Sequence, residues 1–304
     1  MTTPNHPNAQ APQVFAAYVG VILIWATAPL ATKWSGEGPG FLFAVTSRMC
    51  LALVCVLLVL VLRRVAFPFN RRAWLHYGAG AISIYFSMSL SYWAAQQIPS
   101  GWVSVLFGLT PLMTAFLSRI VLAENSLTPR KLAAQVVSLF GLWIIYGTAS
   151  ALGPRAVLAI GALLVAAFIH SLSAVLIKRV NANVPALASV AGALLLSVPA
   201  YLITWWWVED GCPAQLPLRS VLSIVYLGLV ATTVGMSWYF FVLKHYTATR
   251  VAMITFMTPV LALLAGYAFN AEPLTWRIVA GAGLILGGLL LHEVGRLRGI
   301  SPIA

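Results

Sequence analysis

The chain has 304 residues, of which 61% are hydrophobic and 8% are charged, and its formal net charge at pH 7 is +12. This composition is typical of a membrane protein and excludes a soluble globular fold. The positive charge lies mostly between apolar runs, so it gives no reason to expect nucleic-acid binding.

Ten apolar segments are long enough to cross a bilayer, for which about 20 helical residues are needed. The predicted spans cover residues 14–33, 41–62, 74–97, 100–122, 131–148, 155–178, 185–207, 218–243, 248–270 and 276–294. Residues 1–13 contain no Lys or Arg and lack the features of a signal peptide, so we expect a disordered cytoplasmic tail before a retained first helix. A second tail is expected at 295–304. The sequence therefore predicts an all-α integral membrane protein with ten transmembrane helices.

Basic residues are unevenly distributed over the two sides of these spans. Thirteen Lys and Arg residues lie on the side that holds the N-terminus, and four lie on the other side. Because cytoplasmic loops are enriched in these residues, we predict that both termini are cytoplasmic and that the protein lies in the inner membrane. Arg48, within the second span, is interpreted as snorkelling, pairing with Glu37 or facing an aqueous vestibule, with the first two favoured.

The chain contains an internal repeat. Thr110 and Pro111 recur as Thr258 and Pro259, and Glu124 recurs as Glu272, all at an offset of 148 residues. This pairs spans four and five with spans nine and ten, so the repeat unit has five helices and the two units cover 14–148 and 149–294. Because five is odd, the second unit should cross the membrane in the opposite sense, as an inverted repeat. Glu124 and Glu272 are expected to cap or bond local backbone at the turns.

Two stretches carry a family resemblance. Residues 92–128, beginning YWAAQQIPSGWVSVLFGLTP, and residues 226–275, beginning YLGLVATTVGMSWYFF, resemble the EamA branch of the drug/metabolite transporter superfamily. Within that superfamily, the general run of the sequence is most similar to the YddG-type bacterial exporters of aromatic and other neutral amino acids. The resemblance implies ten helices in two five-helix units and a role in transport.

A transport site between two inverted halves should be formed by polar groups near the middle of several helices. The residues that meet this condition are Trp25, Thr27, Tyr85, Ser89, Tyr92, His170, Thr233, Ser237 and Thr255. Together they predict an aromatic, hydroxyl-rich cavity for a small zwitterion with an apolar side chain. The alternative is structural: membrane Ser and Thr often bond to helix carbonyls, and the aromatic residues can simply pack.

Three prolines are candidates for helix kinks that take part in gating. Pro111 and Pro259 occupy matching positions at the middle of spans four and nine, and Pro29 lies in span one. A proline inside a helix removes one backbone hydrogen bond and bends the helix. The alternative is that they only shape the bundle. In span ten, Gly281, Gly283, Gly287 and Gly288 form a small-residue face, which we interpret as packing inside a monomer, with dimerisation as the alternative.

Several kinds of chemistry have no residues to support them. No span carries a carboxylate near its middle, and the sequence has no Walker loop, zinc-ligand cluster or nucleophile–base pair. We therefore expect no enzyme activity, no ATP-driven transport, no cofactor and no metal. His170 is the one candidate for a buried proton carrier, and we favour facilitated transport over proton coupling.

The sequence predicts a membrane exporter of neutral, by preference aromatic, amino acids that works by alternating access. Its expected partners are the small-molecule substrate and membrane lipid, with no nucleic acid. The alternatives are an exporter of other small metabolites or drugs and, more distantly, an intramembrane enzyme.

Overall fold

The computed structural model describes residues 11–123, 129–209, 211, 213–235, 238–239, 241–242 and 248–298. In the first half of the chain the helices are α1 (Ala11–Ser35), α2 (Phe41–Leu62), α3 (Arg71–Ile82), η1 (Ser83–Ser87), α4 (Met88–Ala95), α5 (Ser100–Phe107), α6 (Thr110–Leu122) and α7 (Pro129–Leu152). In the second half they are α8 (Pro154–Val180), α9 (Ala186–Val208), α10 (Leu218–Val225), η2 (Tyr226–Val234), α12 (Ala248–Asn270) and α13 (Trp276–Arg298). The prediction of an all-helical fold is confirmed for this part of the chain.

Each predicted span overlaps one or more of these helices, and several helices are apolar enough to cross a membrane. By length and composition, five helices in the described residues qualify: Pro12–Ser35, Phe41–Leu62, Ser100–Leu122, Pro154–Val180 and Ala186–Val208. Shorter apolar helices cover Leu132–Gly147, Leu218–Val234, Met257–Asn270 and Trp276–Leu291. Large apolar side chains such as Val54, Leu58 and Trp143 are exposed on the outside of the bundle, as expected of a surface that contacts lipid.

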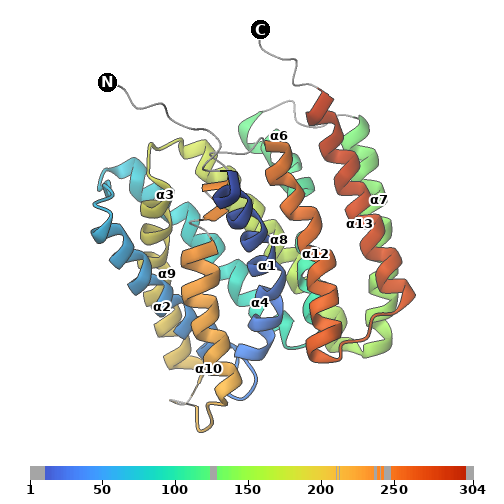
Figure 1. Cartoon of the computed structure of the whole chain (residues 1–304), viewed down its shortest axis with the longest axis horizontal. Helices are drawn as coiled ribbons and strands as arrows, with labels where there is room; N and C mark the ends of the chain where they lie inside the picture. The colour runs from blue at the N-terminus through green and yellow to red at the C-terminus, as the bar shows by residue number, and fades with distance from the viewer. Residues whose placement is uncertain are drawn as a thin grey trace.

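The helices run between two ends of one bundle (Figure 1). At the upper end, which is the top of Figure 1, α1 begins, α2 ends and α13 ends. At the lower end, α1 ends, α5 begins and α12 ends. These two names are used below for the two ends of the molecule.

The two halves of the chain interleave rather than stand apart. From the first half, α1 packs on α12 and α10, α2 packs on α9 and η2, and α5 packs on α12. One hydrophobic core cluster combines buried residues of α2 such as Val45 and Met49 with Leu194 of α9 and Leu227 of η2. Any site at the centre of the bundle therefore has walls from both halves.

The four glycines of the small-residue face of α13 have different surroundings. A Cβ on Gly281 would lie 2.7 Å from Ile145 of α7, and one on Gly288 would lie 2.2 Å from the Ser138 hydroxyl. These two glycines allow α7 and α13 to approach closely, so the interpretation of packing inside the monomer fits them. It is wrong for Gly283 and Gly287, because a Cβ at either position would meet no atom of the described chain within 4 Å.

The matched prolines differ in their effect on the helix. The fourth span is interrupted at Gly108 and Leu109, and Pro111 lies in the first turn of α6, where its missing N–H costs no helical bond. Pro259 lies inside α12, and Pro29 lies inside α1, and both helices continue through them. The interruption at Pro111 thus has no counterpart at its repeat partner.

Candidate functional site

Two π-helical segments, η1 and η2, lie at matching places in the third and eighth predicted spans, which cover residues 74–97 and 218–243. In η2 the hydroxyls of Thr232 and Thr233 donate to carbonyls five residues earlier, Leu227 at 2.9 Å and Gly228 at 3.3 Å. The wider π turn is rare and is frequent at functional sites. Both segments carry polar residues toward the centre of the bundle, and neither was predicted from the sequence.

The first group of predicted residues lies on α1. Thr27 forms a hydroxyl–hydroxyl bond of 2.6 Å with Tyr226 of η2 and also donates to the Leu23 carbonyl at 2.8 Å. The Trp25 ring lies 5.0 Å from the ring of Tyr239. Trp25 and Thr27 therefore face the eighth predicted span, residues 218–243, which belongs to the second half of the chain.

The second group lies on η1 and α4, against α9. The hydroxyl of Tyr85 lies 2.5 Å from that of Thr204, and its ring lies 5.0 Å from the ring of Tyr201. Ser89 donates to the Tyr85 carbonyl at 2.6 Å, and Tyr201 donates to the Ile84 carbonyl at 2.7 Å. Tyr201 and Thr204 were not predicted as site residues. Their only signal in the sequence is their position four and one residues before the tryptophan run at 205–207, which points to an interface belt instead.

Arg48 contacts both Tyr92 of α4, which was predicted as a site residue, and Thr232 of η2. Its Nη1 donates to the Tyr92 hydroxyl at 3.0 Å, and its Nη2 lies 3.5 Å from the Thr232 hydroxyl. Arg48 is 9% exposed and Tyr92 is fully buried. The expectation that Arg48 snorkels or pairs with Glu37 is wrong: Glu37 pairs with Arg219 at 3.6 Å. The reason is that α10 begins beside the turn after α1, where Arg219 also lies 3.9 Å from the Trp34 ring centre.

His170 is connected to η1 through a different residue. Its Nδ1 lies 2.9 Å from the hydroxyl of Ser83, and its ring lies 6.0 Å from that of Phe107 on α5. The side chain is exposed, although it lies about ten residues from the upper end of α8. The structure thus brings α8 to the same π-helical segment that carries Tyr85.

The remaining predicted site residues lie in the eighth and ninth predicted spans, residues 218–243 and 248–270. Thr233 is half-buried and lines a cavity described below. Ser237 lies outside the described residues, and for Thr255 only the helix that contains it, α12, is described.

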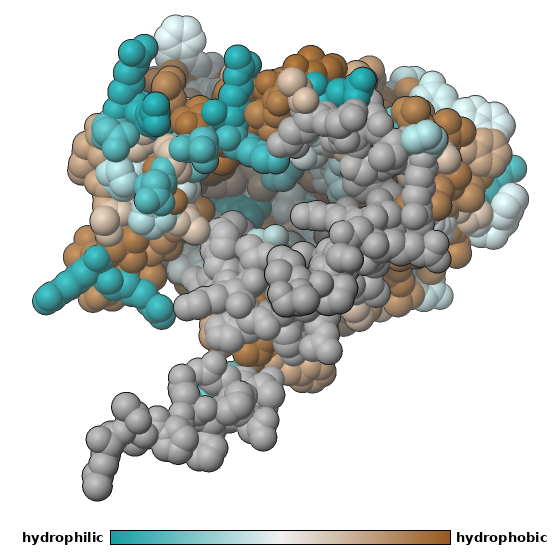
Figure 2. All heavy atoms as spheres, turned by 90° about the horizontal axis from the view of Figure 1, so that it is seen from above, coloured by the Kyte–Doolittle hydropathy of each residue, from teal (hydrophilic) through white to brown (hydrophobic). Residues whose placement is uncertain are grey.

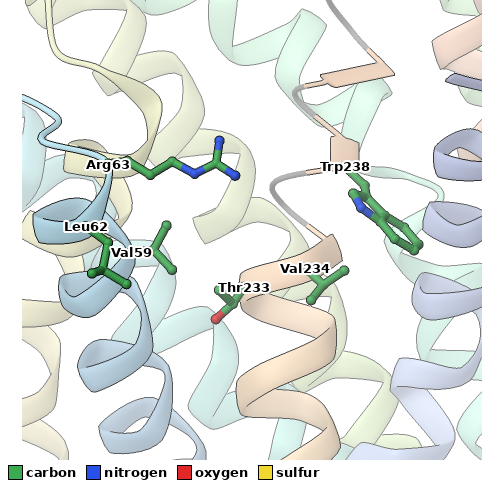
Figure 3. A pocket seen from close by; sticks show the side chains of 6 residues that line it. All are labelled: Val59, Leu62, Arg63, Thr233, Val234 and Trp238. Carbon is green, nitrogen blue, oxygen red and sulfur yellow. The ribbon is translucent and has the colours of Figure 1, made fainter. Parts of the chain in front are cut away.

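A cavity of about 270 Å³ lies between α2 and η2 near the upper end of the bundle, close to the lower limit of typical ligand pockets, roughly 300 Å³. It is lined by Val59, Leu62, Arg63, Thr233, Val234 and Trp238, and Figure 3 shows Val59 and Thr233 from its two walls. Seen from the upper end, the molecule is hollowed at its centre, and hydrophilic side chains gather on the rim on the α3 side (Figure 2).

The lower end, in contrast, has polar contacts between the halves. The carboxylate of Glu272 accepts from the Ser100 backbone N–H at 2.9 Å and from the Ser100 hydroxyl at 3.0 Å. Lys33 lies 3.8 Å from the same carboxylate and donates to the Ile98 carbonyl at 2.8 Å. Trp34 donates to Asn270 at 2.9 Å.

Glu272 was expected to bond local backbone, and this expectation is wrong in one respect. The carboxylate also accepts from the Asn270 side chain at 3.0 Å, but its main partner is the first turn of α5, which is 172 residues away in the chain. Those N–H groups have no partner within their own helix, and the positive end of the helix dipole favours an anion there. Glu124, its repeat partner, lies outside the described residues.

The side chains brought together here can form hydrogen bonds and ring contacts with a ligand. Within the described residues, no group of three or more His, Cys, Asp or Glu side chains could hold a metal ion. The site offers hydroxyls, aromatic rings, one guanidinium and the imidazole of His170, whose Nδ1 lies 2.9 Å from the Ser83 hydroxyl.

Comparison with known proteins shows the family of the chain. The sequence model of the EamA-like transporter family matches residues 14–147 and again residues 157–292. The chain is 25% identical over 293 residues to a probable terminal-alkyne amino-acid exporter of Streptantibioticus cattleyicolor, covering 94% of this chain and 96% of the relative. It is 26% identical over 208 residues to a probable amino-acid metabolite efflux pump of Escherichia coli, covering 65% of this chain and 69% of the relative.

A solved structure titled "Crystal structure of protein" shares the fold, with a TM-score of 0.61 and 21% identity, covering 95% of this chain and 99% of that chain. Since the family match covers most of the chain in two copies, it also accounts for the internal repeat. The chain belongs to the EamA-like transporter family, and it is a multi-pass membrane transporter of the inner membrane and not an enzyme.

Proposed function

We propose that the protein exports neutral amino acids, with a preference for aromatic ones, by alternating access. The observation that carries this proposal is the layer of tyrosines and hydroxyls between the two halves, which lies between a hollowed upper end and a hydrogen-bonded lower end. The names of the relatives from S. cattleyicolor and E. coli, an amino-acid exporter and an amino-acid metabolite efflux pump, support the substrate class.

The chemistry of this layer suits an amino acid with an aromatic side chain. Trp25 and Tyr85 are half-buried rings, on α1 and η1 respectively. Such rings gain free energy by offset or edge-to-face contact with another ring. The hydroxyls of Thr27, Ser89 and Thr233 can exchange their helix carbonyls for the polar end of a substrate.

The positions of the two ends suggest which state of the transport cycle the structure represents. The excess of basic residues on the side of the N-terminus supports a cytoplasmic upper end. The cavity near Arg63 would then face the cytoplasm, and the contacts around Glu272 would close the outer end. Export then requires that the outer contacts open while the upper end closes, and inverted repeats permit this exchange because each half can adopt the other's conformation.

The substrate class is tested by competition in proteoliposomes that contain the purified protein. Uptake of labelled L-phenylalanine would be measured against an excess of unlabelled aromatic amino acids, small neutral amino acids, charged amino acids and organic cations. We expect the aromatic amino acids to compete best, the small neutral ones less and the cations least, because no described carboxylate lies in the site. If organic cations or unrelated metabolites compete and amino acids do not, the proposal is refuted and the alternative of a drug or metabolite exporter is supported.

A further inference from the structure

Arg48 is a cation inside a transmembrane helix that lacks a compensating anion. It lies seven residues, or about 10 Å, beyond the start of α2 and is 9% exposed. Its partners are two neutral hydroxyls, those of Tyr92 and Thr232, and its Nε has no hydrogen-bond partner. A charged residue at such depth is costly and usually marks a functional site.

The described carboxylates are engaged elsewhere or lie at the lower end. Glu37 pairs with Arg219, and Glu272 is bonded to Ser100 and lies near Lys33. Glu209 follows the last residue of α9 and forms no ion pair with Arg48. Among the side chains that the structure describes, none therefore neutralises the guanidinium, and its five N–H groups are only partly satisfied.

The guanidinium lies between the two elements that form the walls of the cavity. Arg48 and Val59 are eleven residues apart on α2, close to three full turns, so they share one face of that helix. On the opposite wall, Thr232, which Arg48 contacts, adjoins Thr233 and Val234 of the cavity lining (Figure 3). Arg48 thus lies about 16 Å from Val59 along the same face of α2, between the cavity and the lower end.

We propose that Arg48 is the residue that binds the carboxylate of the transported amino acid. The hydroxyls of Tyr92 and Thr232 hold the guanidinium in place until the carboxylate displaces the weaker of the two contacts, the one of 3.5 Å to Thr232. A guanidinium binds a carboxylate through two parallel N–H bonds, which a lysine cannot reproduce. The inference rests on the proposed function and defines the substrate class more narrowly: a carboxylate is required, and a substrate in which it is replaced by a neutral group should be rejected.

The test compares L-phenylalanine with two analogues, L-phenylalaninamide, which lacks the carboxylate, and 3-phenylpropionate, which lacks the amine. In wild-type proteoliposomes, L-phenylalanine and 3-phenylpropionate should both compete for uptake, and the amide should compete at least about 30-fold less well. In Arg48→Gln, the KM for L-phenylalanine should rise about 30-fold or more and the preference for the acid over the amide should disappear. Arg48→Lys should give an intermediate preference.

The matched control is Arg155→Gln, which removes an exposed arginine from the first turn of α8 and should leave the preference unchanged. A purely structural role for Arg48 would lower the transport of acid and amide alike. If Arg48→Gln does not yield a monodisperse protein, Arg48→Lys decides alone, since it keeps the charge. The inference is overturned if the wild type transports the amide as well as the acid, or if an Arg48 variant keeps the wild-type preference. Wild-type protein that accepts no amino acid would refute the proposed function instead.

Discussion

Three aromatic residues of the proposed site have different environments. Trp25 and Tyr85 are half-buried, whereas Tyr92 is fully buried and bonded to Arg48. All three were predicted from their depth in the membrane. Depth follows from counting residues along a helix, at about 1.5 Å each. The direction in which a side chain points depends on the neighbouring helices, and this information is not in the sequence of one span. Under the proposed function, Tyr92 therefore acts on the substrate through Arg48.

The two half-buried rings lead to a prediction at the residue scale. Trp25→Ala and Tyr85→Ala should each raise the KM for aromatic amino acids about 10-fold, because each removes a ring that, under the proposed function, contacts the substrate side chain. Transport of small neutral amino acids should change much less. Tyr85→Phe, which keeps the ring and loses the bond to Thr204, should have the smaller effect.

This prediction is checked by uptake kinetics in proteoliposomes with equal amounts of protein. Trp143→Ala is the control, because Trp143 is 67% exposed on α7 and contacts none of the site residues. Wild-type kinetics for aromatic substrates in both the Trp25 and the Tyr85 variant would show that the cavity has been assigned to the wrong residues.

Arg48 shows a second limit of sequence reasoning at this scale. The sequence suggested Glu37 as its partner because both lie near the lower end of adjacent helices. The observed partners, Tyr92 and Thr232, are 44 and 184 residues away in the chain. Contacts between helices so distant in the sequence depend on how the bundle packs, and a single sequence does not specify this.

At the scale of helices, the sequence predicts where spans begin and end better than how they are built inside. The second span was predicted at 41–62, and α2 covers Phe41–Leu62. This succeeds because hydropathy changes sharply at the membrane surface. The π-helical segments η1 and η2 were not predicted, because the residues that form a π turn also suit an α-helix. The break before Pro111 was expected only as a kink.

The contact between Glu272 and α5 leads to a prediction at this scale. Glu272→Ala removes the acceptor from the Ser100 and Gly101 N–H groups, each of which costs about 1–3 kcal/mol when left without a partner. The closed lower end should therefore become less stable relative to the open one. Glu272→Gln retains one acceptor oxygen and should have a smaller effect.

The measurement is the labelling of a single cysteine at position 27 by a membrane-impermeant maleimide added to intact cells, with Cys50, Cys55 and Cys212 replaced by Ser. Labelling should be about 5-fold faster in Glu272→Ala than in the parent, which corresponds to about 1 kcal/mol. Equal rates in the parent and in Glu272→Ala would mean that Glu272 does not hold the outer end closed.

At the scale of the whole molecule, duplication was visible in the sequence and is matched by the two copies of the family model over 14–147 and 157–292. Because each predicted repeat has five helices, an odd number, the two repeats should cross the membrane in opposite senses. The proposed alternating-access mechanism uses this inversion. The two ends of the present structure differ, with a cavity near the upper end and polar contacts across the lower end. A transporter that cycles between two such states would exchange these features, and an enzyme or a channel would have no need to do so.

The central claim, that the protein carries amino acids by alternating access, is tested most directly by counterflow. Proteoliposomes loaded with unlabelled L-phenylalanine are diluted into a trace of labelled L-phenylalanine, without ATP and without an ion or pH gradient. The account predicts that the label accumulates transiently above its equilibrium level and then declines, because each outward step of unlabelled substrate returns a binding site that can carry label inward. Monotonic equilibration without an overshoot, or no protein-dependent entry of label for any amino acid, would contradict it.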